Sequence, residues 1–92
     1  MDQYRMEPDG TVMAAGMGQV VAFFDPSGGI YSHRGGTQIG FVDPQGGVYT
    51  HNGGQRLGRV DSDGSVWNAS NQRLGHVDPP VHRRGALLLL LG

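Results

Sequence analysis

Apolar positions along the chain follow a repeating pattern with a period of 18 residues. A β-branched residue holds the same place in each unit, as Val12, Ile30, Val48 and Val66. The residue after it is large, as Met13, Tyr31, Tyr49 and Trp67. The apolar groups are short and are separated by turn-forming residues, which is typical of strands joined by turns. The units span residues 4–21, 22–39, 40–57 and 58–74, and a partial unit spans 75–92 of this single domain, 1–92.

Each unit predicts a β-hairpin bounded by a tight turn and a looser turn. The tight turns read Asp-Pro-Ser-Gly at 25–28 and Asp-Pro-Gln-Gly at 43–46. Aspartate at the first position bonds the backbone ahead of it, proline presets φ, and glycine supplies the positive φ of a type I turn with a bulge. The looser turns are rich in glycine and asparagine, as at 52–55. We expect no helix, because no window shows helical apolar spacing over two turns.

The strand before each tight turn carries two apolar residues three positions apart, such as Leu57 and Val60. Strict alternation cannot place both on one face of a sheet. A bulge or bend is therefore expected at the glycine between them, Gly58. The residue after this glycine varies, as Arg59 does against Phe23 in an earlier unit, and we expect it to face solvent.

The predicted fold class is all-β, with four to five hairpins of about 18 residues around a pseudo-rotational axis. A lone hairpin cannot bury its apolar face in water, so the hairpins must pack on one another. Closure into a small barrel or a propeller-like ring would also remove exposed sheet edges. We therefore expect a closed arrangement.

The units G-F-V-D-P-Q-G-G-V-Y and G-R-V-D-S-D-G-S-V-W resemble the short G-x-V-x-D-x-x-G-type repeats of small bacterial domains of unknown function. The fold of those domains has been called a β-flower, with hairpins as petals around an axis. The resemblance covers residues 4 to 78. It implies the fold, and it implies neither an activity nor any functional residue.

Composition narrows the function classes. Seven basic and eight acidic residues give a net charge of -1, which leaves no basic excess for nucleic acid. The absence of cysteine excludes disulfides and thiolate metal sites and favours a cytoplasmic location. The sequence shows no signal peptide and no motif of a nucleophile, a phosphate loop or a zinc protease. We expect no enzyme and no cofactor.

One set of residues is a candidate ligand site. Tyr31, Tyr49 and Trp67 would form an aromatic ring around the axis, with His33 and His51 beside it. Such a ring stacks on a sugar, a base or a cation. Large residues at one repeat position equally suit a shared core, which is the interpretation we favour. We expect no metal site, because the two histidines lack further ligands, and the repeated turn acids are expected to stabilise the turns.

The apolar run from Ala86 to Leu91 departs from the repeat. It is far shorter than the roughly 20 residues of a membrane-spanning helix, and membrane contact is not expected. We expect a strand that closes the ring or meets another subunit. The resulting hypothesis is a structural or protein-interaction module that self-associates. The alternative is a small-ligand-binding domain that uses the aromatic ring.

Overall fold

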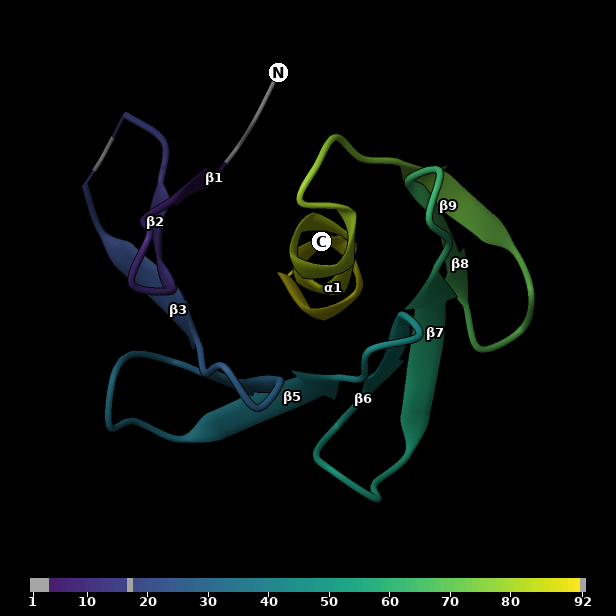
Figure 1. Cartoon of the computed structure of the whole chain (residues 1–92), viewed down its shortest axis with the longest axis horizontal. Coiled ribbons are helices and arrows are strands. Elements are labelled where there is room, and N and C mark those ends of the chain that lie inside the picture. Colours follow the sequence, from purple (N-terminus) through teal and green to yellow (C-terminus); the bar gives the residue numbers. More distant parts are fainter. Residues whose placement is uncertain (1–3, 17, 92) are drawn as a thin grey trace.

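The computed structural model describes residues 4–16 and 18–91. Nine antiparallel strands form one sheet in chain order, and a helix follows them (Figure 1). The strands are β1 (Tyr4–Met6), β2 (Thr11–Ala14), β3 (Val20–Phe24), β4 (Gly29–Tyr31), β5 (Gln38–Val42), β6 (Gly47–Tyr49), β7 (Arg56–Val60), β8 (Ser65–Asn68) and β9 (Arg73–His76), and the helix is α1 (Val81–Leu91). The predicted dominance of β structure is confirmed.

The tight turns have the predicted geometry. Gly46 donates its N–H to the carbonyl of Asp43 at 3.0 Å, and Asp43 donates to the carbonyl of Gly47 at 2.9 Å. Gly46 has a φ of +94°, and a Cβ there would collide with the carbonyl oxygen of Val60. This is a type I turn followed by a bulge, and only glycine fits its last position.

The predicted bulge lies beside the repeated glycine. In the pairing of β6 with β7, Val48 lies opposite Gly58 and Tyr49 lies opposite Arg56, so Leu57 is the extra residue. The same register shift occurs between β2 and β3, β4 and β5, and β8 and β9. The bulge is confirmed, and it turns each hairpin relative to the one before it.

The sheet is open. β1 and β9 are its edges and do not pair with each other, so the predicted closed barrel is wrong. The sheet instead curls around α1, which lies in the middle of the molecule (Figure 1). Because a helix occupies the centre, the apolar inner face is covered without joining the two edges.

The apolar run was predicted to be a strand, and this prediction is wrong, because residues 81–91 form a helix. Leucine and alanine are strong helix formers. Residues 87–91 are five consecutive leucines, so they show no one-sided apolar periodicity by which a helix could be detected. Ala86 and Leu87 of this run are buried within the same chain.

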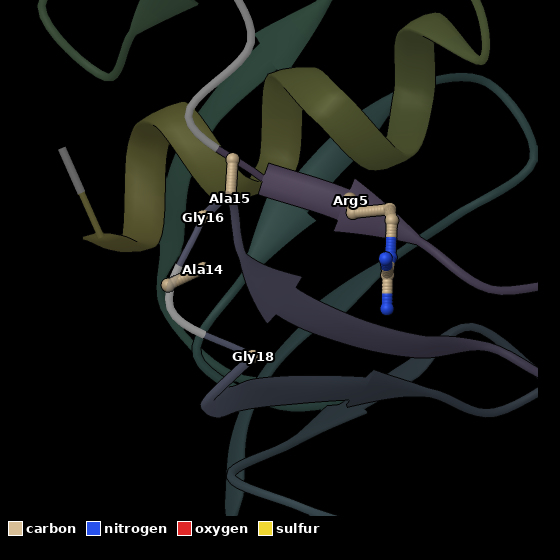
Figure 2. Close-up of a pocket in the computed structure, with 5 residues that line it drawn as sticks. All are labelled: Arg5, Ala14, Ala15, Gly16 and Gly18. Carbon is tan, nitrogen blue, oxygen red and sulfur yellow. The ribbon is translucent and has the colours of Figure 1, made fainter.

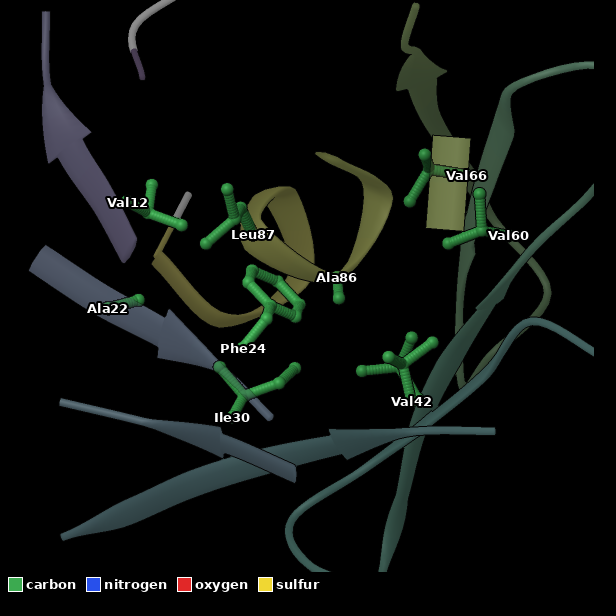
Figure 3. Close-up of a cluster of buried hydrophobic side chains, with 10 residues drawn as sticks. Val12, Ala22, Phe24, Ile30, Val42, Val60, Val66, Ala86 and Leu87 are labelled. Carbon is green, nitrogen blue, oxygen red and sulfur yellow. The ribbon is translucent and has the colours of Figure 1, made fainter. Parts of the chain in front are cut away.

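The core lies between α1 and the inner face of the sheet (Figure 3). Its buried apolar residues are Val12, Ala22, Phe24, Ile30, Val42, Val48, Val60, Val66, Ala86 and Leu87. The repeated β-branched residues, Val12, Ile30, Val48 and Val66, are thus all buried. Phe23, expected to face solvent, is only 8% exposed, because Arg34 stacks over its ring at 4.4 Å.

Three successive leucines of α1 each meet the repeated glycine of a different hairpin. A Cβ at Gly40 would lie 2.7 Å from Leu90, and one at Gly58 would lie 2.9 Å from Leu89. At Gly75 the nearest leucine atom, from Leu88, would lie 3.7 Å away. The glycines therefore make room for the helix. Their role is steric, in addition to the bulge that they flank.

Candidate functional site

The aromatic residues of the predicted ring lie outside the core. Tyr31, Tyr49 and Trp67 each follow a fully buried β-branched residue and are themselves half-buried. Alternation along a strand directs them to the opposite face of the sheet from α1. They stand on β4, β6 and β8, and another strand separates each from the next. The interpretation of these residues as a shared core is therefore wrong.

Trp67 is held by polar neighbours. Its indole N–H donates to Asp61 at 2.9 Å, and the guanidinium of Arg59 lies 4.8 Å from the ring centroid. Arg59 also forms an ion pair with Asp61 at 3.3 Å and donates to Asn71 at 2.7 Å. These contacts join the turns at both ends of the fourth hairpin across its outer face.

A comparable contact joins two hairpins. Arg34, in the loop after β4, stacks on Phe23 and pairs with Asp9 of the first tight turn at 3.1 Å. Phe23 also faces that turn, since a Cβ at Gly10 would lie 3.4 Å from its ring. The sequence does not predict this cluster, because no spacing rule relates an arginine in one loop to a turn 25 residues earlier.

His33 and His51 are exposed in the looser turns of separate hairpins. Each places Nδ1 close to the carbonyl oxygen of the next residue, at 3.0 Å for His33 and 3.1 Å for His51. The structure does not bring them together with a third ligand. In residues 4–16 and 18–91, no group of three or more His, Asp or Glu side chains is arranged to hold a metal ion.

The turn acids act as caps of the backbone. Asp25 accepts the N–H of Ser27 at 2.7 Å, and this bond lowers the pKa of its carboxyl from the ordinary value of 3.8. The same kind of bond, to Thr11 and Ser65 respectively, lowers the pKa of Asp9 and of Asp63. A carboxylate that accepts backbone N–H bonds is favoured in its charged form. Of the repeated acids, Asp25 thus has the expected turn-stabilising contact.

A cavity of about 370 Å³ lies beside the first loose turn, lined by Arg5, Ala14, Ala15, Gly16 and Gly18 (Figure 2). Of the described residues that line it, Arg5 alone is charged, and Arg5 pairs with Glu7 at 2.9 Å. None of the five predicted ligand-binding residues lines it. The cavity therefore offers no free group that would define a ligand.

Three large apolar side chains of the described residues are exposed: Val20 (41%), Leu74 (48%) and Leu91 (41%). Val20 begins β3, Leu74 lies in β9, and Leu91 ends α1. β3 and β9 lie on opposite sides of α1 (Figure 1).

The comparisons with protein-family models, with curated proteins and with solved structures find no match to this chain. Of the helices among the described residues, none has the length and the apolar character to cross a membrane.

Proposed function

We propose that this chain is a structural or protein-interaction module that self-associates. The supporting observation is that three large apolar side chains, Val20, Leu74 and Leu91, are exposed to solvent. Contact with a second copy would remove apolar surface of this kind from water, which is favourable. A symmetric contact between two copies is the commonest form of a homodimer.

We further propose that the hairpins are related by a pseudo-rotational axis along α1, as in the β-flower that the repeats resemble. The support is the 18-residue period together with one leucine for each of three repeated glycines.

The test compares the full chain with a Leu74→Ser/Leu91→Ser double variant by light scattering over a range of concentrations. We expect the full chain to form dimers or larger assemblies and the double variant to stay monomeric. Gln45→Ser, at an exposed tight turn, is the matched control and should behave as the full chain. A full chain that is monomeric at all concentrations overturns the proposal.

The alternative is a small-ligand site formed by Tyr31, Tyr49 and Trp67. Its support is that these rings are half-buried and lie on the outer face, where a stacking ligand has access. A Trp67→Ala variant tests it in a screen of sugars and aromatic cations. Because the ring lies outside the core, the variant should stay folded, so loss of a ligand found with the full chain would favour this alternative.

A further inference from the structure

The last strand, β9, has a neighbour on one side only within residues 4–16 and 18–91. Val77 donates its N–H to the carbonyl of Gly64, on the β8 side, at 2.9 Å. Successive residues of a strand direct their backbone groups to opposite sides, so the N–H and C=O of His76 point away from β8. The side chain of His76 does not cover them, because its Nε2 lies 2.7 Å from the carbonyl oxygen of Asp63. His76 thus presents an open edge.

The repeat shows what is missing at this edge. His76 occupies in β9 the place that Arg59 occupies in β7, 17 residues earlier. Arg59 is paired with Trp67 of β8, the strand that follows the tight turn. In the same way, Phe41 is paired with Tyr49 of β6. Each strand that precedes a tight turn is therefore followed by a strand that pairs with it. β9 occupies the same place in the repeat and has no such partner after it among the residues that the structure describes.

The chain does not supply that second strand, because its turn sequence fails after Val77. The segment 78–81 reads Asp-Pro-Pro-Val, so Val81 stands where Gly46 stands in the third hairpin. The φ of Gly46 is +94°, a conformation that is strained for a β-branched residue. The chain enters α1 at Val81 instead, and no strand of residues 4–16 and 18–91 pairs with the outer edge of β9.

The strands that follow the tight turns show which kind of sequence could pair with the free edge of β9. They read Gly-Ile-Tyr, Gly-Val-Tyr and Ser-Val-Trp at 29–31, 47–49 and 65–67. The first residue is small and buried, the central β-branched residue has no exposed surface, and the aromatic residue is half-buried on the outer face. A segment beside β9 would have to meet the same requirements, with its β-branched side chain directed to the α1 side of the sheet.

We propose that the free edge of β9 binds an extended segment of another protein, which adds a further antiparallel strand and carries the pattern small, β-branched, aromatic. Main-chain hydrogen bonds supply affinity in such strand addition, and alternate side chains supply specificity. The inference rests on the proposed role as a protein-interaction module, but not on self-association. A second copy of this chain cannot supply such a strand, because the strands that follow its tight turns, β2, β4, β6 and β8, each already have two neighbours.

The test uses a capped peptide with the sequence of residues 46–51, Gly-Gly-Val-Tyr-Thr-His, titrated into the full chain labelled with nitrogen-15. We expect changes in amide chemical shift at His76 and its neighbours in β9. Two N-methylated peptides form a matched pair. In the predicted pairing, the tyrosine N–H bonds to His76 and the valine N–H points away. Methylation of the tyrosine N should weaken binding at least tenfold relative to methylation of the valine N.

Two variants of the protein test the same edge from the other side. His76→Pro removes the N–H at the edge, and His76→Ala keeps it while removing the same side-chain contact with Asp63. We expect the proline variant to lose binding and the alanine variant to retain it. Equal affinity of the two N-methylated peptides overturns the proposal, and so does the absence of shifts at His76 with millimolar parent peptide. Light scattering on the same samples reports self-association separately, so either proposal can fail alone.

Discussion

The hairpins and the central helix are stabilised in opposite ways. Each hairpin carries its own local hydrogen bonds, and its turn glycine and turn acid stabilise the backbone through contacts within a few residues. The helix has no acidic residue in its first turn and no basic residue in its last, and it contains Gly85. An isolated helix of about this length is marginal in water. Its conformation therefore depends on the sheet that surrounds it.

The two regions also depend on each other. The inner face of the sheet carries a β-branched residue from each hairpin, and α1 is what covers these residues. The contact is close, because Gly85 abuts Val60 and the leucines abut the repeated glycines. Turn chemistry thus specifies the hairpins, and packing specifies the helix. Substitutions in the two regions should therefore change the free energy of unfolding by different amounts.

The largest effect is expected where the helix enters the core. Leu87 is 1% exposed, and Leu87→Ala should lower the free energy of unfolding by about 2–5 kcal/mol, because a cavity replaces the side chain. Leu91→Ala, on the same helix but exposed, should lower it by less than about 0.5 kcal/mol. Urea denaturation of both variants measures the difference. Equal losses would show that the helix is not inserted as described.

The next effect concerns the contact between the two regions. Gly58→Ala places a Cβ against the carbonyl of Trp67 and 2.9 Å from Leu89, and overpacking of this kind costs about 1–3 kcal/mol. Gly75→Ala is the matched control, since its Cβ would meet only Leu88 at an ordinary 3.7 Å. Thermal melts followed by circular dichroism should separate the two variants. If Gly58→Ala is as stable as Gly75→Ala, the leucines do not press on the repeated glycines.

A smaller effect is expected within one turn. Gly46→Ala should cost roughly 1 kcal/mol or more, because alanine is strained at positive φ and its Cβ meets the carbonyl of Val60. Gln45→Ala changes an exposed side chain in the same turn and should be nearly neutral. Chemical denaturation measures both. A neutral Gly46→Ala would mean that the turn has another conformation.

The smallest effect is the pH dependence of a turn acid. The backbone bond from Ser27 lowers the pKa of Asp25 below 3.8, so the folded state favours the charged carboxylate. Its contribution to stability is present above the unfolded pKa and is lost as pH falls through the lowered folded pKa. The melting temperature of Asp25→Asn should therefore lie slightly below that of the parent at pH 6, and the gap should close in strong acid. A gap independent of pH would contradict this.

The sequence was sufficient to predict the hairpins, because the residues that determine them lie close together in the chain. Gly46 and Asp43 encode a turn within four residues, and the 18-residue period multiplies the signal. Leu57 and Gly58 likewise revealed the bulge. The helix had no such signal, because the leucine run is apolar on every side and its environment comes from strands far away in the chain.

The candidate site was harder to predict from the sequence, for a different reason. Val48 and Tyr49 are both apolar neighbours in one strand, and alternation alone does not tell which of them faces the core. The structure gives the inner face to the β-branched residue, which fits the limited space next to a helix. Arg34 reaches Phe23 and Asp9 only through the relative placement of two hairpins. Nothing along the chain predicts that placement.

The width of the helix also limits how many hairpins can surround it. Successive residues of an α-helix are offset by about 100°, so neighbouring leucines point in well-separated directions around the axis. Leu88, Leu89 and Leu90 meet Gly75, Gly58 and Gly40, which is the reverse order of the hairpins along the chain. A chain with several more units would have to curl around a wider space than one helix of about 10 Å diameter fills. Duplication of hairpins in this architecture is therefore limited by the width of a single helix.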